Sequence, residues 1–164
     1  KTIPSISPSM DIQVSSNFER ALFDAYGRDG AAVAQLMDEL KGGGFEVSQG
    51  AMEALKEVYD SGCVSEEETS SQITTSLDAS SELLCPHSAV GVKVAEEQRV
   101  AGTPMITLAT AHPAKFPAAV EAATGIHPPL PPRMSDLYER TERVTRVPND
   151  LAALMTHIKE NRSQ

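Results

Sequence analysis

The segment at residues 103–109, with the sequence TPMITLA, decides how the whole chain is interpreted. It is short and apolar, it contains β-branched residues, and nothing after Pro104 interrupts it, so it predicts a β-strand. A lone parallel strand has no sheet to join. Either the domain is therefore mostly helical, or the other strands of its sheet lie in sequence outside this chain.

On both sides of this segment the apolar residues follow helical spacing rather than alternation. Capping boxes are predicted at Ser16 with Glu19 and at Ser65 with Glu68, and Pro86 is placed to open a third helix. Phe45 and Val47 are interpreted as a second short strand. Helices are expected from Ser16 to Tyr26, over 33–40, around 52–58, from Ser65 to Leu77, from Pro86 to Ala95, over 113–123, and after an Asn149 cap.

Composition excludes several classes of protein. The chain has 164 residues, 40% of them apolar, and a net charge of −9. A basic patch for nucleic acid is not present, and the chain has no apolar run near the ~18 residues of a membrane span. The proline-rich stretch at 126–133 is interpreted as a stiff surface connector rather than a polyproline ligand. Two cysteines without CxxC spacing favour a reduced, cytoplasmic protein without a zinc site.

Three short segments carry clusters of polar and ionisable side chains at the ends of predicted elements. The first, DIQVSSNFER at 11–20, places hydroxyls and an amide at a helix N-terminus, where an anion is favoured, with Arg20 one turn inside. The second is PHSAVGV at 86–92. The third, ATAHPAKF at 109–116, follows the predicted strand, and ligands of α/β sheets collect beyond the carboxyl ends of strands. Spacing alone identifies no catalytic triad.

These three segments, in this order, resemble the C-terminal part of threonine synthases. The pair VSSNFER and TAHPAKFP carries most of the resemblance, which extends from about Ser7 to Asn161. It implies a helix-rich α/β fold of the tryptophan synthase β-subunit type with an incomplete sheet. The chain, residues 1–164, would form the C-terminal part of a larger enzyme, made of part of the cofactor-binding domain and a helical subdomain at roughly 27–85.

The resemblance also implies a reaction and a cofactor. Threonine synthases convert O-phosphohomoserine and water into threonine and phosphate with pyridoxal phosphate bound to a lysine. That lysine lies upstream in the family, so no catalytic residue is expected here, and Lys115 is interpreted as structural or anion-contacting. Thr110 is expected to face the pyridine nitrogen of the cofactor, and Ser16, Asn17 and Arg20 are expected to bind the substrate.

One departure from the family pattern lies in the second segment. Threonine synthases commonly have Asp and Thr where this chain has Cys85 and Ser88. Serine keeps the hydroxyl, whereas cysteine removes a charge. Two hypotheses therefore remain at this point: the chain is a fragment of an enzyme that needs its N-terminal part, or it is a non-catalytic helical interaction module derived from the same fold.

Overall fold

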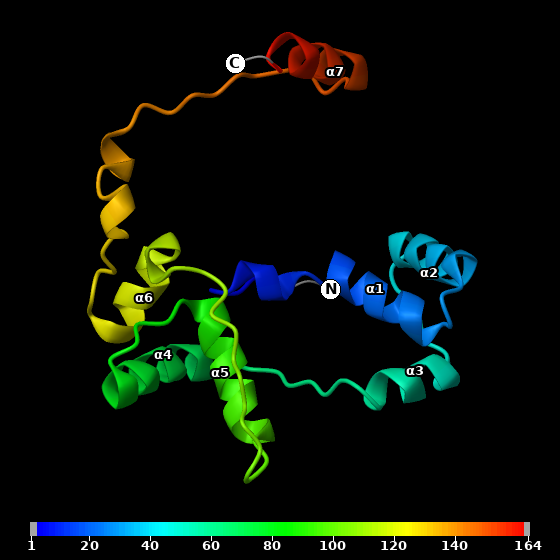
Figure 1. The fold of residues 1–164 in the computed structure, drawn as a ribbon, viewed down its shortest axis with the longest axis horizontal. Coiled ribbons are helices and arrows are strands. Elements are labelled where there is room, and N and C mark those ends of the chain that lie inside the picture. The colour runs from blue at the N-terminus through cyan, green and yellow to red at the C-terminus, as the bar shows by residue number, and fades with distance from the viewer. Residues whose placement is uncertain (1–2, 163–164) are drawn as a thin grey trace. The chain divides into compact units, whose positions relative to one another are not determined.

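A computed structural model describes residues 3–162 of the chain (Figure 1). It divides into two compact units, Lys1–Pro129 and Leu130–Gln164. The first unit contains six α-helices in its described part: α1 (Ser16–Ala25), α2 (Gly30–Lys41), α3 (Gln49–Lys56), α4 (Glu66–Ser80), α5 (Pro86–Gln98) and α6 (Pro117–Thr124), with the 3₁₀ turns η1 (Pro8–Asp11) and η2 (Pro113–Lys115).

Helices α1, α2 and α3 share a small apolar core. Its buried members are Leu22, Val33, Leu36 and Leu55, one or two from each helix. Val33, Leu36 and Met37, whose spacing predicted a helix, are therefore the residues that α2 directs toward this core. The expected strand at Phe45 and Val47 is wrong, because both side chains pack individually against this core, and the segment between α2 and α3 has no strand partner among residues 3–162.

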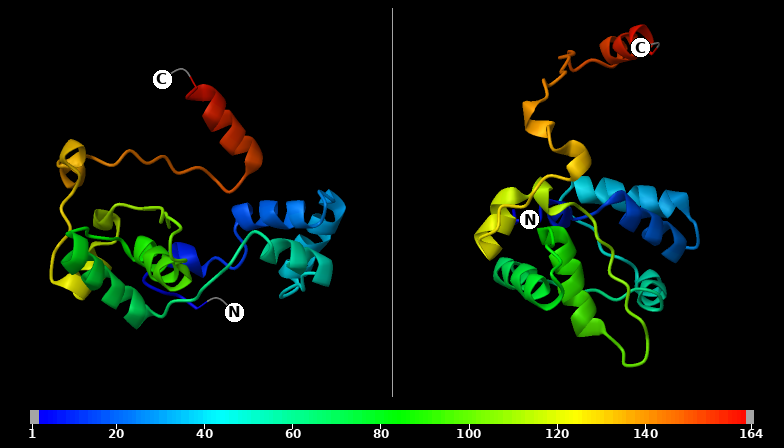
Figure 2. Two further views of the ribbon diagram at one scale, coloured as in Figure 1. Left: turned by 60° about the horizontal axis from the view of Figure 1, so that its bottom comes forward. Right: turned by 60° about the vertical axis from the view of Figure 1, so that its left-hand side comes forward.

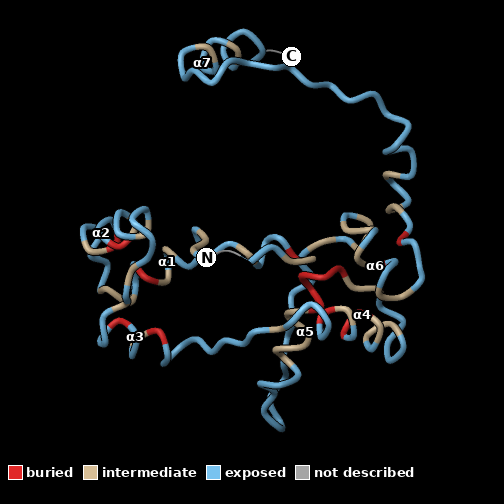
Figure 3. The backbone as a smooth tube through the Cα atoms, turned by 180° about the vertical axis from the view of Figure 1, so that it is seen from behind, coloured by how far each residue is buried: buried red, intermediate tan, exposed pale blue. Residues whose placement is uncertain are grey.

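Helices α4, α5 and α6 form the second cluster of the unit. Helix α4 packs against both α5 and α6, and Ile73, Ala89 and Val120 are completely buried there. The hydroxyl of Thr74 also donates a hydrogen bond to the carbonyl oxygen of Ala123 (2.9 Å). Figure 2 shows these helices from two further sides, and Figure 3 marks buried residues in this cluster as well as in the core of α1, α2 and α3.

The helix ends follow local sequence signals in most places. The capping box of Ser65 and Glu68 is confirmed with both of its hydrogen bonds, and Pro86 is the first residue of α5. Helix α6 ends at Gly125, which adopts a left-handed conformation (φ +74°) that favours glycine. The capping box predicted at Ser16 is wrong: Ser15 is the N-cap of α1, and within the described chain its side chain caps no backbone N–H.

The strand predicted over residues 103–109 is also wrong. Residues 3–162 contain no β-strand, and the segment runs beside α5 with Ile106 and Leu108 about four-fifths exposed (81% and 76%). A strand is defined by hydrogen bonds to a neighbouring strand, which no described segment of this chain supplies. Residues 103–109 therefore have the composition of a strand but pair with no other strand among residues 3–162.

The second unit holds η3 (Pro132–Met134), η4 (Leu137–Glu139) and α7 (Leu151–Glu160). Asp150, rather than the predicted Asn149, caps α7 by accepting a hydrogen bond from the N–H of Ala153 (2.7 Å). The apolar side chains of α7 are largely exposed: Leu151, Leu154, Met155 and Ile158. In the part of the chain that the structure describes, no helix is both long and apolar enough to cross a membrane. The subdomain at 27–85 stays a prediction.

Candidate functional site

The end of the 103–109 segment lies over the N-terminus of α5. A hollow of about 400 Å³ opens at this point, and it is lined from two directions. The turn before α5 and its first helical turn supply one side, and the residues that follow the segment supply the other. The lining residues are Glu82, Leu83, Leu84, Cys85, Ser88, Ala109, Thr110, Ala111, His112 and Pro113.

The N-terminus of α5 is capped by a buried thiol. Pro86 at the first helical position needs no hydrogen-bond partner for its nitrogen, which leaves Cys85 as the N-cap. The Sγ of Cys85 accepts a hydrogen bond from the N–H of Ser88 (3.4 Å) and lies 3.3 Å from the Ser88 hydroxyl. Cys85 is fully buried and Ser88 is 3% exposed, so water does not replace these contacts.

Ser88 links this cap to Thr110. The N–H of Thr110 donates a hydrogen bond to the Ser88 Oγ (3.0 Å), and the Thr110 Oγ1 lies 3.3 Å from the same oxygen. The Cys85 Sγ is 4.0 Å from the Thr110 Oγ1. Ser88 is buried whereas Thr110 is exposed, so Thr110 stands at the edge of the hollow on a fixed support. The structure thus brings together two of the three segments singled out in the sequence.

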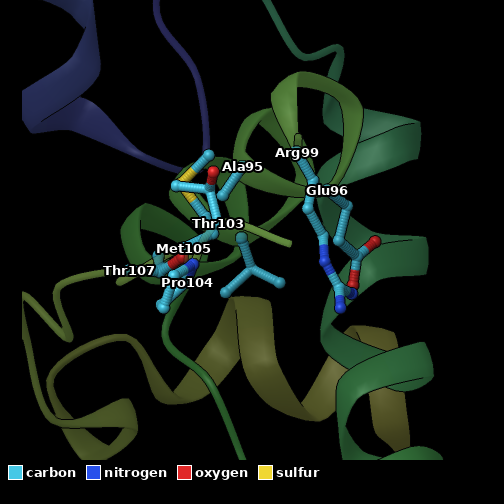
Figure 4. A pocket seen from close by; sticks show the side chains of 8 residues that line it. Ala95, Glu96, Arg99, Thr103, Pro104, Met105 and Thr107 are labelled. Carbon is cyan, nitrogen blue, oxygen red and sulfur yellow. The ribbon is translucent and has the colours of Figure 1, made fainter. Parts of the chain in front are cut away.

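The segment approaches α5 closely at Gly91. A Cβ on Gly91 would lie 3.3 Å from the Thr107 Cγ2, closer than an ordinary contact. Further along α5 the same pair of elements encloses a second hollow of about 430 Å³. Figure 4 shows Pro104, Met105 and Thr107 on one side of it and Glu96 and Arg99 of α5 on the other. The segment therefore follows α5 closely enough to fix the position of Thr110.

Burial and hydrogen bonding act in opposite directions on Cys85. Burial raises the pKa of its thiol, but an ionised sulfur would accept hydrogen bonds from the hydroxyl and N–H of Ser88, from the Thr110 hydroxyl and from the backbone of Ala111. These bonds outweigh burial and hold the pKa below its ordinary value. No group of three or more histidine, cysteine, aspartate or glutamate side chains in the described chain is arranged to bind a metal ion. The polar groups beside Thr110 are the Ser88 hydroxyl and the Cys85 thiol, while Glu82 and His112 line the hollow from exposed positions.

His87, the next residue of α5, faces the N-terminal segment. Its Nε2 accepts a hydrogen bond from the N–H of Ser9 (3.1 Å), and its ring centroid lies 4.5 Å from that of Phe116. The buried Nδ1 has no hydrogen-bond partner among residues 3–162. Burial first, and the positive charge of Lys115 second, lower the pKa of His87, while the carboxylate of Asp11 raises it. The ring is thus a neutral structural contact between η1 and α5.

Lys115 and His112, the ionisable residues of the third segment, make different contacts. Lys115 belongs to η2, is exposed and does not line the hollow; its Nζ lies 6.0 Å from the centroid of the Phe116 ring. His112 lines the hollow and caps η2, because its Nδ1 accepts a hydrogen bond from the N–H of Ala114 (3.2 Å). Of these two residues only His112 lines the hollow with Thr110, and its Nδ1 is already engaged by the backbone of Ala114.

The start of α1 carries the predicted substrate residues. Ser16, Asn17 and Arg20 are all exposed. The Ser15 hydroxyl hydrogen-bonds to the Asn17 side chain, so no side-chain oxygen in the described chain caps the first N–H groups of the helix. Arg20 makes no ion pair within 4.0 Å with any residue in the range 3–162. This helix end is open to solvent.

A third hollow of about 670 Å³ adjoins this end of α1. It is lined by α1, α3 and the residues that follow α3: Asn17, Phe18, Ala21, Met52, Leu55, Lys56, Tyr59, Asp60 and Ser61. It shares no residue with the hollow at Thr110. The structure therefore does not bring Ser16, Asn17 and Arg20 into one site with Thr110, and whether they bind a substrate stays a prediction.

Sequence reasoning missed the roles of Cys85 and Ser88. Both residues were noted as departures from a family pattern, but not as the support of Thr110. A signal was available: Pro86 at the first helical position makes Cys85 the N-cap, and a residue three positions after an N-cap faces it. The contact with Thr110 had no such signal, because 22 residues separate Ser88 from it.

The chain is similar to known threonine synthases in sequence. The family model described as threonine synthase, C-terminal, matches residues 88–158. Threonine synthase of Pseudomonas aeruginosa is 48% identical over 161 residues, covering 96% of this chain and 34% of the relative. That of Methylobacillus glycogenes is 39% identical, covering 94% of this chain and 33% of the relative.

Solved structures agree with the sequence relatives. A structure of threonine synthase from Brucella melitensis with bound PLP matches with a TM-score of 0.83 and 45% identity, covering all of this chain and 36% of that one. The yeast threonine synthase structure matches with a TM-score of 0.74 and 31% identity. The chain belongs to the threonine synthase family, and it spans about a third of the length of the relatives it matches.

Proposed function

We propose that this chain is the C-terminal part of a pyridoxal-phosphate enzyme that converts O-phosphohomoserine and water into threonine and phosphate. The observation that carries the proposal is the 48% identity to a threonine synthase over almost the whole chain. The exposed β-forming segment at 103–109 supports it, because such a segment needs strands from elsewhere. We further propose a fold of the tryptophan synthase β-subunit type and a cytoplasmic location, which suits two free cysteines.

The hollow at Thr110 fits the ring of this cofactor in its donor set. The hydroxyls of Thr110 and Ser88 are neutral, and each can donate or accept a hydrogen bond. When bound, pyridoxal phosphate supplies an electron-withdrawing ring that stabilises negative charge on the carbon atoms of the substrate. We place Thr110 at the ring nitrogen because it stands at the edge of the hollow and is held by Ser88.

A hydroxyl at the ring nitrogen has a chemical consequence. Thr110 can donate to an unprotonated nitrogen or accept from a protonated one, whereas a carboxylate would hold the proton there. The only carboxylate that lines the described hollow is the exposed Glu82. The residues of this chain therefore favour a ring of moderate rather than strong electron demand.

The open end of α1 is proposed to hold the anionic substrate. Its first N–H groups point out of the helix without a side-chain cap, which favours negative charge. Arg20 adds a guanidinium that can bind a phosphate or carboxylate through two parallel hydrogen bonds. Ser16 and Asn17 add a hydroxyl and an amide at the same helix end.

The chemistry also needs a base that this chain does not supply. Lys115 is exposed, lies over the Phe116 ring and does not line the Thr110 hollow, so nothing in its position suits the lysine that carries the cofactor. We propose that this lysine and the site for the cofactor phosphate belong to an N-terminal part of the enzyme. Proton removal from the substrate is then assigned to that part as well.

Two preparations test the proposal. The first is the 164-residue chain alone, and the second is the product of the complete reading frame that contains it. We expect phosphate release from O-phosphohomoserine only from the second, in the presence of pyridoxal phosphate. Turnover by the isolated chain, free of host enzyme, would contradict the placement of the lysine. A complete product without turnover would favour a non-catalytic interaction module.

A further inference from the structure

Each hydroxyl at the Thr110 hollow has one proton, and the surrounding acceptors decide where that proton points. The Ser88 Oγ already accepts the N–H of Thr110 (3.0 Å). Its own proton has two acceptors at the same distance of 3.3 Å, the Cys85 Sγ and the Thr110 Oγ1. The sulfur of the neutral thiol already accepts the N–H of Ser88 and is a weak acceptor, whereas the Thr110 oxygen is a stronger one.

We propose that Ser88 is a positioning residue that donates to the Thr110 Oγ1 and thereby leaves the Thr110 proton directed into the hollow. This inference rests on the proposed function, because the acceptor there is the unprotonated ring nitrogen of the cofactor. Cys85 contributes by holding the N–H of Ser88 at the helix cap, so that Ser88 keeps one orientation. Without the hydrogen bond from Ser88, the Thr110 hydroxyl could equally direct a lone pair, rather than its proton, into the hollow.

Burial makes the arrangement specific. Cys85 and Ser88 are 0% and 3% exposed, so little of either side chain is open to water and the neighbouring protein groups are the main acceptors for Ser88. Thr110 is the only exposed member of the three, which makes it the one that reaches a ligand. The three residues therefore form a short chain of hydrogen bonds that starts in the protein interior and ends at the hollow.

The test uses the complete enzyme reconstituted with cofactor that carries ¹⁵N in its ring. The chemical shift of this nitrogen reports whether it accepts a hydrogen bond, and it does so without turnover. Ser88→Ala should move the shift toward that of a ring nitrogen without a hydrogen bond and weaken cofactor affinity about fivefold. Ser88→Thr keeps the hydroxyl and should restore the parent shift.

Controls separate this inference from others. Ser80→Ala removes an exposed hydroxyl that donates to the Ser76 carbonyl oxygen (2.7 Å), and Cys63→Ala removes the exposed thiol; neither should change the shift. Thr110→Val is the reference. If Thr110→Val moves the shift and Ser88→Ala leaves it unchanged, Ser88 only supports the fold and the inference is wrong. If Thr110→Val also has no effect, the cofactor assignment of the proposed function fails instead.

Discussion

Two helix N-termini in the first unit have the same local ingredients and opposite surroundings. Helix α5 starts inside the protein, where Cys85 caps it and Ser88 connects it to Thr110. Helix α1 starts at the surface, where Ser15 bonds to a neighbouring side chain instead of the backbone. At the α5 terminus the Cys85 side chain accepts the N–H of Ser88, while no side chain among residues 3–162 caps α1 and its first donors are available to a ligand.

Because one terminus is buried and the other is exposed, the two suit different ligands. Buried and paired groups keep one geometry, which suits a cofactor that stays bound through the reaction. Exposed donors with a guanidinium one turn away suit a charged molecule that enters and leaves. Substitutions at the two termini should therefore separate effects on substrate from effects on cofactor.

The largest expected effect is at the α1 terminus. Arg20→Ala in the complete enzyme removes a charge-assisted contact with the substrate, so kcat/KM should fall about 10- to 150-fold, as expected for a hydrogen bond to a charged group. Cofactor affinity should stay unchanged. Steady-state kinetics and cofactor titration measure the two quantities. Unchanged kinetic constants would show that Arg20 is an ordinary surface residue. Arg28→Ala is the matched control, because the Arg28 side chain already pairs with Asp24.

At the α5 terminus, substitutions are expected to change the affinity and the absorption of the bound cofactor. Thr110→Val keeps the shape and removes the hydroxyl, which leaves the ring nitrogen without a partner and should weaken cofactor affinity by about 1–3 kcal/mol, or roughly 5- to 150-fold. Thr110→Asp should favour a protonated ring and shift the absorption band of the bound cofactor. An experimental structure of the complete enzyme with Thr110 Oγ1 more than about 4 Å from the ring nitrogen would rule the assignment out.

A smaller effect concerns pH and the buried His87. Because its pKa is lowered in the folded protein, the unfolded chain binds protons more readily, and stability is lost as pH falls below the ordinary histidine pKa of about 6.5. His87→Gln should flatten this part of the dependence of the melting temperature on pH. His112→Gln, at an exposed position, is the control. A parent-like pH dependence in His87→Gln would show that protonation of His87 does not limit stability.

Sequence alone was sufficient where the determining interaction is local. The Ser65 and Glu68 pair, Pro86 and Gly125 each act within four residues, and each marks a helix end as predicted. The start of α1 shows the limit of such signals. Two adjacent serines can both act as caps, and the structure has Ser15 as the N-cap where the local pattern favoured Ser16.

Non-local features could not be predicted in the same way. Residues 103–109 have the composition of a strand, but strand formation depends on partners that no local pattern in this chain reveals. The pairing of Ser88 with Thr110 depends on how the segment passes Gly91, which only the fold determines. The resemblance to threonine synthases pointed to Thr110 and not to the residues that support it.

The smallest expected effect is the loss of stability when the serine N-cap of α4 or of α1 is replaced. Ser65→Ala removes a hydroxyl that accepts from the N–H of Glu68 (3.2 Å) and should destabilise the start of α4 by about 1 kcal/mol. Ser15→Ala should cost less than about 0.5 kcal/mol, because Ser15 makes no side-chain cap among residues 3–162. Hydrogen exchange of the first-turn amides of α4 and α1 measures both changes in the complete enzyme. Equal losses of protection would show that Ser15 caps α1 after all. The open terminus proposed for the substrate would then be closed by its own side chain, and the contrast with α5 would be lost.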